Sequence, residues 1–433
     1  MPDFFKPSRR AFIRGAGALA AAGVTAPLEA AARRDVVVLT AYPDAVVSRF
    51  EAAFEKAWPR YRLRVVWRMP HDALPYLRQP GQGGVDVYWS ASPRTFAQLK
   101  AEQALRKMPV SLIGLPGRVG GSVIDDPDGY FAASEVAGYG FAVNPGYLAR
   151  HGLPAPADWS DLAQPAYAGH VLVPDPVEVG FAPVLVDIPL QAYGWDTGWA
   201  LWSAIAANAR FVGRGGSFVS DELGAGRQGV GLSIDFFVAS AIANGAPLRF
   251  VYPRQGGVNP AHVAVTAGSP NPDGAKAFVG LVLSEAGQRI LTHPDIRKLP
   301  VRPSVYANLP AGYHDPFATA AQGGYRYDNA LGRGRAAPAA AAFGQALVRP
   351  HARLAALWQR LRAADGGTWA KVWPLLSAAP CKESEVDDPA VQQAFFTRRD
   401  DPAAEARAAA LEAGWAAAAQ ARHEKAAALL GGA

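Results

Sequence analysis

The sequence predicts an α/β fold with doubly wound sheets, followed by a helical C-terminal region. Two observations carry this prediction. Short apolar runs alternate with amphipathic segments from residue 36 to about residue 291, a pattern typical of parallel strands connected by helices. Beyond residue 339 the short runs give way to alanine-rich segments with helical periodicity. The length of 433 residues, half of them hydrophobic, predicts two or three domains with a sizeable core.

Composition limits the classes of partner and cofactor. The formal charge is +6, but the basic residues are scattered, which argues against nucleic acid as the main partner. The single cysteine, Cys381, excludes a disulfide within the chain and a cysteine-based zinc or iron–sulfur site. We therefore expect neither a cofactor nor a metal, and we interpret Cys381 as a thiol without a functional role.

Residues 1–32 are predicted to be an export signal. Arg9 and Arg10 mark a charged start, a weakly apolar stretch follows over residues 15–26, and small residues continue to Ala32. The paired arginines are typical of the twin-arginine route, and the apolar stretch is too short for a permanent membrane span. We expect cleavage after Ala32. An uncleaved anchor helix is the alternative.

The first part of the chain predicts three parallel strands, at residues 36–40, 63–67 and 85–89. The carboxyl ends of parallel strands meet at one edge of a sheet, where the free N–H groups of the following helices favour a polar or anionic ligand. Side chains at these ends are therefore candidates for ligand binding. They are Thr40, Tyr42, Ser90 and Ser92. For the two serines, capping of the next helix is the alternative role.

A long apolar strand over residues 135–144 leads into a second set of strands and helices. Strands are predicted at residues 170–173 and 210–212. The helix predicted over residues 194–207 carries three tryptophans, which we interpret as core rather than as a sugar-binding surface. Residues 224–229 match a dinucleotide-binding motif by letter. Because they close a helix and precede a strand, we expect turn glycines instead.

The apolar run over residues 229–239 is predicted to be a buried strand that floors a ligand pocket. A carboxylate at the end of a buried strand must be paired, hydrated or bound to a ligand, and Asp235 occupies this place. Ser233, Phe236 and Phe237 are expected near it. In the alternative interpretation, Asp235 caps the next helix, and Phe236 and Phe237 belong to the core.

Three stretches, taken in order, resemble the extracellular solute-binding proteins of ABC importers, of the ferric-iron, phosphoglycerate and polyamine type. They are Trp159-Ser160-Asp161-Leu162, the helical segment over residues 273–291, and Pro300-Val301-Arg302-Pro303. The resemblance covers roughly residues 35–364. It implies the type II fold of periplasmic binding proteins, in which two doubly wound lobes are joined by two crossing strands. A cleft between such lobes closes like a hinge over its ligand.

The resemblance also implies where the lobes begin and end. The predicted boundaries are residues 33–138 with 261–338 for the first lobe, 139–260 for the second lobe, and 339–433 for the helical C-terminal region. The crossing strands are expected near residues 138–143 and 261–265. Residues 323–328 and 332–335 are expected to form loops with solvated arginines. The helical region is expected to pack on one lobe, with a free arm as the alternative.

Departures from the family pattern narrow the choice of ligand. Iron-binding members carry adjacent tyrosines where this chain has Phe236 and Phe237, and phenylalanine cannot ligate a metal. Ferric iron is therefore disfavoured and stays an alternative. Glu178 stands where members that bind phosphorylated solutes show hydroxyl side chains, which weakens a phosphate interpretation. Ser217, which follows a glycine-rich loop, and the two serines of the first lobe remain as hydroxyl donors.

The other candidates suggest an organic ligand. Asp235 and Glu178 suit an ammonium or hydroxyl group, and Tyr42, Trp89 and Tyr139 could stack on the ligand. We therefore expect a small polar organic solute, zwitterions included. As the resemblance implies, the protein is expected to be a periplasmic monomer that delivers this solute to an ABC permease of the inner membrane.

Two other functions stay open at this stage. A solute sensor that presents its ligand to a membrane receptor kinase would share the fold and the pocket. An exported enzyme is a different class. The chain has no H-E-x-x-H, G-x-S-x-G or P-loop motif, but a dispersed Ser-His-Asp triad that uses His71, His151 or His262 is an alternative.

Overall fold

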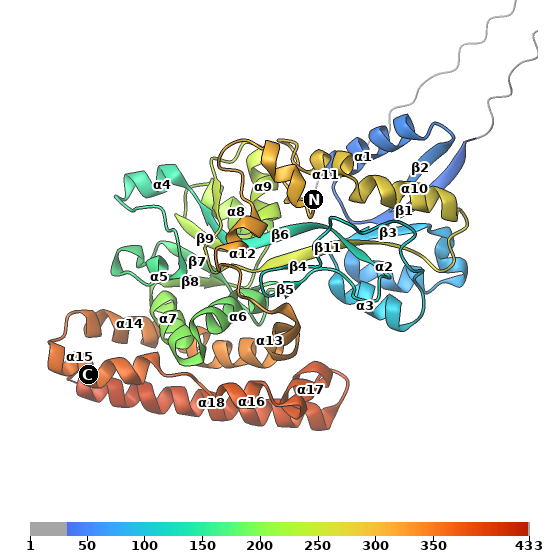
Figure 1. Cartoon of the computed structure of the whole chain (residues 1–433). Helices are drawn as coiled ribbons and strands as arrows, with labels where there is room; N and C mark the ends of the chain where they lie inside the picture. The colour runs from blue at the N-terminus through green and yellow to red at the C-terminus, as the bar shows by residue number, and fades with distance from the viewer. Residues whose placement is uncertain (1–32, 432–433) are drawn as a thin grey trace, which may run out of the picture.

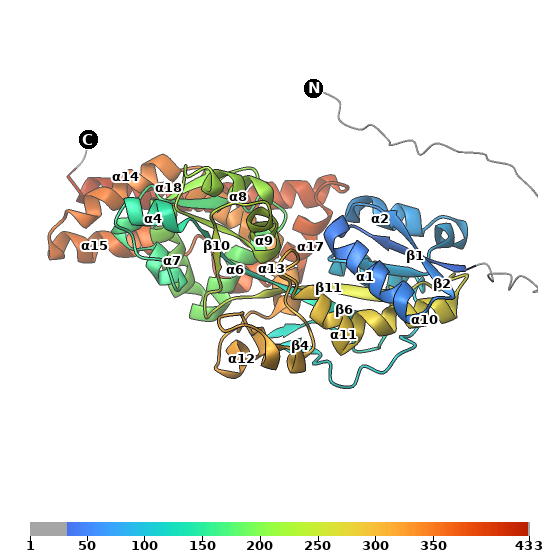
Figure 2. The ribbon, with the colours of Figure 1, turned by 90° about the horizontal axis from the view of Figure 1, so that it is seen from above.

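The computed structural model describes residues 33–431, so the export signal predicted over residues 1–32 lies outside the described residues. A mixed sheet of nine strands runs through this part of the chain, with helices on both faces (Figure 1, Figure 2). Its strand order is β2-β1-β3-β11-β6-β9-β7-β8, with β10 also paired to β6. The sheet therefore has two groups of parallel strands, which β11 and β6 connect.

The first lobe is built on three parallel strands, as predicted. They are β1 (Arg34–Thr40), β2 (Tyr61–Trp67) and β3 (Val87–Ser90). At the carboxyl ends, Thr40 lies opposite both Trp67 and Trp89. The connections are α1 (Asp44–Ala57), α2 (Pro70–Leu77), the 3-10 helix η1 (Pro80–Gly84) and α3 (Pro93–Ala101). Helix α1 buries the apolar face that its helical spacing predicts, including Phe50 and Phe54.

Two antiparallel strands, β6 (Ala132–Val143) and β11 (Val258–Val265), carry the chain between the lobes. They cover the places where crossing strands were expected. Every residue of β6 is buried. Up to Gly138 this strand pairs with β11, and beyond it with β9 and β10. Gly138 is needed at this change of partner, because a Cβ here would lie 2.6 Å from the ring of Tyr252.

The second lobe repeats the alternation of strands and helices. Its strands are β7 (Val171–Pro174), β8 (Ala209–Val212), β9 (Val230–Ile234) and β10 (Arg249–Val251). Strand β7 lies parallel to both β8 and β9. Its helices are α4 (Pro145–Arg150), α5 (Trp159–Leu162), η2 (Pro165–Tyr167), α6 (Ala182–Tyr193), α7 (Trp195–Asn208), α8 (Ser217–Gly224) and α9 (Asp235–Ala243). The carboxyl ends of β7 and β9 therefore lie at one edge.

Two predictions for this lobe have different outcomes. Residues 224–229 close α8 and precede β9, which confirms that their glycines belong to a turn. The prediction of a single strand over residues 229–239 is wrong, because β9 ends at Ile234 and Phe236 lies in α9. A short run of consecutive apolar residues does not distinguish a strand from a buried helix.

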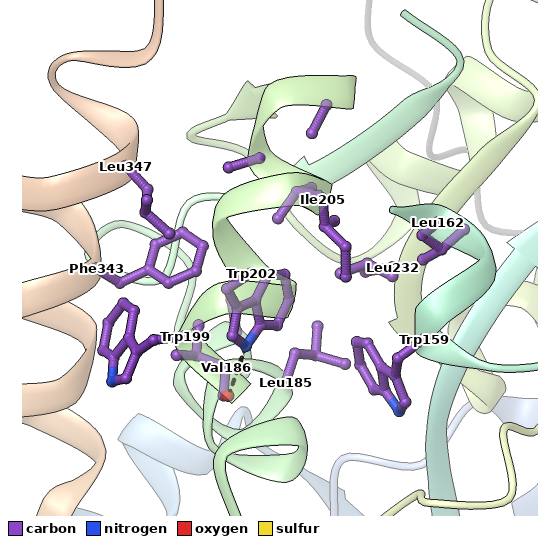
Figure 3. Close-up of a cluster of buried hydrophobic side chains, with 14 of the residues drawn as sticks. Trp159, Leu162, Leu185, Val186, Trp199, Trp202, Ile205, Leu232, Phe343 and Leu347 are labelled. Carbon is purple, nitrogen blue, oxygen red and sulfur yellow. Dashed lines mark hydrogen bonds between the residues drawn. The ribbon is translucent and has the colours of Figure 1, made fainter. Parts of the chain in front are cut away.

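The tryptophans of α7 lie in the largest hydrophobic core, which confirms their interpretation (Figure 3). Trp199 and Trp202 are almost fully buried. The indole Nε1 of Trp202 donates to the carbonyl of Val186 at 2.9 Å. The ring of Phe343 packs against Trp202, with centroids 5.1 Å apart. This core therefore joins the second lobe to the C-terminal helices.

The chain returns to the first lobe after β11. The elements of this segment are α10 (Pro272–Leu283), α11 (Glu285–Leu291), η3 (Pro303–Asn308) and α12 (Pro316–Ala321). A small hairpin of β4 (Arg118–Val119) and β5 (Ser122–Val123) lies beside this returning segment, because Ser122 donates to the carbonyl of Tyr327. The returning segment therefore contacts the region where the lobes meet.

The C-terminal helices form a layer against α6 and α7 of the second lobe (Figure 1). They are α13 (Asn329–Phe343), the π-helical turn η4 (Gly344–Val348), α14 (His351–Arg362), α15 (Gly366–Ser377), α16 (Glu383–Val386), α17 (Pro389–Thr397) and α18 (Pro402–Leu429). We call residues 329–431 the C-terminal layer. Each helix within residues 33–431 is too short or too polar to span a bilayer.

The prediction that residues 332–335 form a solvated loop is wrong. They lie inside α13, and the side chain of Arg335 is only 2% exposed. Its guanidinium lies 3.6 Å from Asp187 and 3.1 Å from both Glu383 and Asp387. A buried charge is tolerated only when it is paired, and these three carboxylates meet that condition.

Candidate functional site

Asp235 stands at the start of α9, directly after β9, and its side chain is almost fully buried. Its Oδ2 accepts hydrogen bonds from the backbone N–H of Gly138 at 2.8 Å and from the hydroxyl of Tyr252 at 3.0 Å. Asp235 therefore binds the crossing strand β6. It does not cap α9, so the alternative interpretation of this residue is wrong. Burial raises the pKa of Asp235 to about 7.

A second carboxylate lies close by on β6. Glu135 is 2% exposed, and its Oε1 accepts from the hydroxyl of Tyr42 at 2.7 Å and from Nζ of Lys298 at 2.6 Å. Its other oxygen, Oε2, has no hydrogen-bond partner among the described residues. Because a buried carboxylate oxygen without a donor is costly, this atom is suited to accept from a ligand or a water.

Lys298 pairs with Glu135 and lies beside aromatic rings from both lobes. The backbone of Leu299 beside it accepts from Val136 at 3.0 Å, which fixes this loop against β6. The Nζ atom of Lys298 lies 5.1 Å from the ring centroid of Tyr42 and 5.3 Å from that of Phe236. Tyr42 follows β1 of the first lobe, and Phe236 lies in α9 of the second lobe. We call Tyr42, Glu135, Asp235, Phe236, Tyr252 and Lys298 the junction cluster.

The junction cluster contains three of the predicted site residues, Tyr42, Asp235 and Phe236. Thr40 lies next to it, and its Oγ1 accepts from the N–H of Tyr42 at 3.1 Å. Burial raises the pKa of Tyr42, and the neighbouring Glu135 carboxylate acts in the same direction. The Tyr42 hydroxyl therefore stays a hydrogen-bond donor at neutral pH.

The other predicted residues of the first lobe and β6 lie outside that cluster, but Trp89 borders it. Its ring packs on Tyr42, with centroids 4.5 Å apart, while its indole donates to Ser134 at 3.0 Å and the side chain is 1% exposed. Ser90 is buried in the β3–β11 ladder. The Oγ of Ser92 lies 2.8 Å from Oγ1 of Thr95, and it caps no backbone N–H of α3. Tyr139 is buried in the second-lobe core, and burial raises its pKa.

Glu178 and Ser217 are exposed on the second lobe. Glu178 packs over Gly213, where a Cβ would collide with its carboxylate. Ser217 begins α8 directly after Gly216, whose φ of 61° requires glycine. Gly216 itself lies against the ring of Phe237. This glycine-rich loop therefore borders the phenylalanines that lead to the junction cluster.

A row of aromatic rings connects that loop to the cluster. The ring centroids of Phe181 and Phe237 are 5.8 Å apart, and those of Phe237 and Phe236 are 4.1 Å apart. Phe236 then lies under Lys298. Both Phe236 and Phe237 are partly buried, so each ring packs against its neighbours and keeps part of its surface exposed.

Sequence reasoning missed three members of the junction cluster. Glu135 carried a signal, since it is a charged residue in an otherwise buried strand, as Asp235 was at the end of one. Tyr252 and Lys298 carried none, because each follows a short element and reaches the cluster only through tertiary packing. Tyr252 also stacks on His314, with centroids 3.8 Å apart.

Two surface hollows are described, and neither contains a predicted site residue. One of about 500 Å³ opens at the carboxyl end of β2, where Trp67 lies opposite Thr40. The other, of about 820 Å³, lies between α7 and α15. Within residues 33–431, no three His, Cys, Asp or Glu side chains gather as a metal site would require.

Comparisons with known proteins place this geometry in context. Residues 85–319 match the family described as bacterial extracellular solute-binding proteins. The phosphoglycerate transport regulatory protein PgtC of Salmonella typhimurium is 32% identical over 219 residues, which cover 51% of this chain and 54% of that protein. The chain thus spans about half the length of the curated relatives it matches. Residues 320–433 lie beyond the family match.

Three solved structures have a similar fold at low sequence identity. The periplasmic binding protein AfuA of Actinobacillus pleuropneumoniae, with fructose-6-phosphate bound, has a TM-score of 0.53 at 17% identity and covers 73% of this chain and 100% of its own. Ferric iron-binding protein A of Mannheimia haemolytica has 0.53 at 15%, covering 67% and 94%. The spermidine/putrescine-binding protein PotD of Streptococcus pneumoniae has 0.54 at 14%, covering 68% and 93%.

Proposed function

The chain belongs to the family of bacterial extracellular solute-binding proteins, and from this premise we propose that it captures a small polar organic solute between its lobes for an ABC permease. The observation that supports this most is the junction cluster. It combines a lysine, two carboxylates and aromatic rings from both lobes and from the crossing strand. A solute that contacts both sides would favour one arrangement of the lobes over others.

The donors and acceptors of the cluster indicate the chemistry of the solute. Oε2 of Glu135 needs a donor, which a hydroxyl or ammonium group of the solute would supply. Lys298 would attract an anionic group, because its ammonium is a compact positive charge with three donors. The start of α8, beyond Gly216, has no side-chain cap and would add to this attraction. We therefore propose a hydroxylated or aminated solute that also carries a negative charge.

Phosphorylated hydroxy compounds are the first solutes to test. The printed names of two similar proteins refer to phosphoglycerate transport and to bound fructose-6-phosphate. Ferric iron is disfavoured, because Phe236 and Phe237 supply no oxygen ligand. An exported enzyme is disfavoured too: the family is one of binding proteins, and His262 is buried against the carbonyl of Ile124 at 2.8 Å.

A sensor role is the second candidate, since the relative in Salmonella is named a transport regulatory protein. The two roles differ in the membrane partner. Crosslinking of the tagged protein in cells, followed by mass spectrometry of the membrane fraction, should recover a permease for the importer role. Recovery of a receptor kinase without a permease would favour the sensor.

Export to the periplasm by the twin-arginine route, as a monomer, is part of the same proposal. Replacement of both arginines, Arg9→Lys with Arg10→Lys, should leave the protein in the cytoplasm with its N-terminal segment uncleaved. Cell fractionation and intact-mass measurement test this. Normal export of the double variant would contradict the twin-arginine route but not solute binding.

A thermal-shift screen tests the function itself. The panel should contain organophosphates, amino acids, polyamines, hydroxy acids and Fe(III). At least one organic compound should raise the Tm of the wild type, and Asp235→Asn should remove that shift. The matched control is Asp273→Asn, an exposed carboxylate in the first turn of α10. A full shift in Asp235→Asn would contradict the assignment of the site.

A further inference from the structure

A side-chain contact joins the C-terminal layer directly to the first lobe. Phe396 lies in α17 of the layer, and Arg94 lies in α3 of the first lobe. The guanidinium carbon of Arg94 lies 5.2 Å from the centroid of the Phe396 ring. Both side chains are at the surface, and Phe396 is 67% exposed. A guanidinium over the face of a ring is attracted by the quadrupole of that ring.

The C-terminal layer is fixed to the second lobe. Its buried Arg335 pairs with Asp187 of α6. The indole Nε1 of Trp358 donates to Ser203 of α7 at 3.0 Å, and Ser203 donates to the carbonyl of Leu376 at 2.6 Å. Since these contacts are buried and join three helices of the layer to α6 and α7, the layer is expected to move with the second lobe.

Helix α17 is held firmly within the layer. The ring of Phe395 stacks on Trp415 of α18, with centroids 5.8 Å apart and an interplanar angle of 10°. Arg398, just after α17, binds Glu405 and Glu412 of α18, each at 2.7 Å. Because Phe395 points inward, its neighbour Phe396 points outward. Both ribbon views show α17 at the end of the layer nearest the first lobe (Figure 1, Figure 2).

Helix α3 is equally well fixed in the first lobe. Its Phe96 is fully buried and stacks on Tyr88 of β3, with centroids 4.5 Å apart. Arg94 is in the first turn of α3 and faces solvent. The contact between Arg94 and Phe396 therefore links two rigid parts of the molecule by a route that bypasses the crossing strands β6 and β11.

We propose that the C-terminal layer is a strut, and that the contact of Phe396 with Arg94 restrains the hinge between the lobes in the arrangement described. A rotation of the lobes that separates α3 from α17 must break this contact. The strut lies beyond the segment that matches the family. The proposal does not depend on which solute the junction binds, or on whether it binds one.

The test is the distribution of distances between the lobes, measured by pulsed electron paramagnetic resonance on the protein without added solute. Spin labels are attached through Lys56→Cys in α1 and Arg150→Cys in α4, both exposed, in a Cys381→Ser background. Phe396→Ala and Arg94→Ala should each broaden the distribution. Loss of one exposed cation–π contact should raise the population of other arrangements about two- to fivefold.

Three further variants sharpen the test. The double variant Arg94→Ala with Phe396→Ala should broaden the distribution no more than either single variant, because both remove the same contact. Phe396→Trp should narrow it, since tryptophan binds cations best. Leu429→Ala, at the far end of α18, is the control and should match the wild type.

Two outcomes would overturn the strut. One is a distribution in both single variants that equals that of Leu429→Ala. The other is broadening that adds up in the double variant, which would show that the two side chains act separately. Circular dichroism and an unchanged Tm would confirm that each variant is folded, as expected for exposed positions.

Discussion

Two buried charge clusters differ in the residue that carries the positive charge and in how tightly it is held. In the C-terminal layer, Arg335 is 2% exposed and has three carboxylates around it, those of Asp187, Glu383 and Asp387. We call this group the anchor cluster. In the junction cluster, the side chain of Lys298 is 10% exposed and forms an ion pair with one carboxylate, that of Glu135. Both clusters keep a buried carboxylate oxygen without a hydrogen-bond partner among the described residues, on Glu135 in one and on Asp187 and Asp387 in the other.

This difference indicates which of the two clusters has a structural role and which one can bind a solute. Arginine offers five donors in a planar fork, so it fixes several carboxylates in one geometry. Lysine is a point charge on a flexible stem, and it can exchange one acceptor for another at lower cost. We therefore infer that the anchor cluster holds helices together, and that the junction cluster is available to a solute.

The largest expected effect is at the anchor. Arg335→Met would leave Asp187 buried without its cation and should lower the free energy of unfolding by about 3–5 kcal/mol. Urea unfolding measures this change. The control is Arg333→Met, an exposed position two residues earlier in α13, which should stay within about 0.5 kcal/mol of the wild type. Equal losses in both variants would contradict the role of the anchor.

A smaller loss of stability is expected at the junction. Lys298→Met removes a charged hydrogen bond from Glu135, which keeps the hydroxyl of Tyr42, so the cost should be about 2 kcal/mol. The affinity for any solute found in the screen should fall more than about tenfold. The control is Lys276→Met on α10, which is exposed. If both variants bound the solute equally, Lys298 would not contact it.

The pH dependence of stability should show the burial of Asp235. Its pKa is raised from 3.8 to about 7, so the folded state binds more protons than the unfolded state between these values. Stability should therefore fall as the pH rises from 4 to 7, by at most about 1.4 kcal/mol per pH unit from this group. Asp187, whose pKa burial raises to about 6, acts in the same direction.

Asp235→Asn should make the fall of the free energy of unfolding with pH less steep up to pH 7. Asp187→Asn should also make this fall less steep, but only up to about pH 6. Urea unfolding at half-unit steps of pH measures both slopes. A stability curve for Asp235→Asn that runs parallel to the wild type would show that this carboxyl titrates at its ordinary pKa.

The smallest expected effect is on the alkylation rate of Cys381, which we use to detect loosening of the anchor cluster. Burial raises the pKa of its thiol to about 12, and its carbonyl accepts from the indole of Trp195 at 2.9 Å. Alkylation by iodoacetamide at pH 8 should be at least about tenfold slower in the folded than in the unfolded chain. Arg335→Met should speed it and Lys298→Met should not. Equal alkylation rates in Arg335→Met and Lys298→Met would contradict the distinction between the anchor cluster and the junction cluster.

The same comparison shows how far the sequence could predict the molecule. Most strands and helices of both lobes follow from local periodicity, and so does the buried face of α1, but the helix that begins at Asp235 does not. Asp235 was found because a carboxylate ended an apolar run. Glu135 carried a similar signal in β6, but its partner Lys298 approaches it only when the loop after α11 is fixed against Val136.

The burial of Arg335 could not be predicted from the sequence. Arg335 stands in a segment rich in glycine, alanine and arginine, which is typical of an exposed loop. Its burial depends on Asp187, Glu383 and Asp387, which lie far away in the sequence and meet it only in the packed layer. Charges that pair across distant segments leave no local pattern, so neither cluster could be predicted as a whole.

The central claim is that a solute binds at the junction cluster. Hydrogen exchange with mass spectrometry, in the presence and absence of the best solute from the screen, tests this claim most directly. We expect slower exchange in peptides from β6, from the start of α9 and from the loop at Lys298. Protection confined to the hollow near Trp67, or to the hollow between α7 and α15, with no change at the junction, would contradict it.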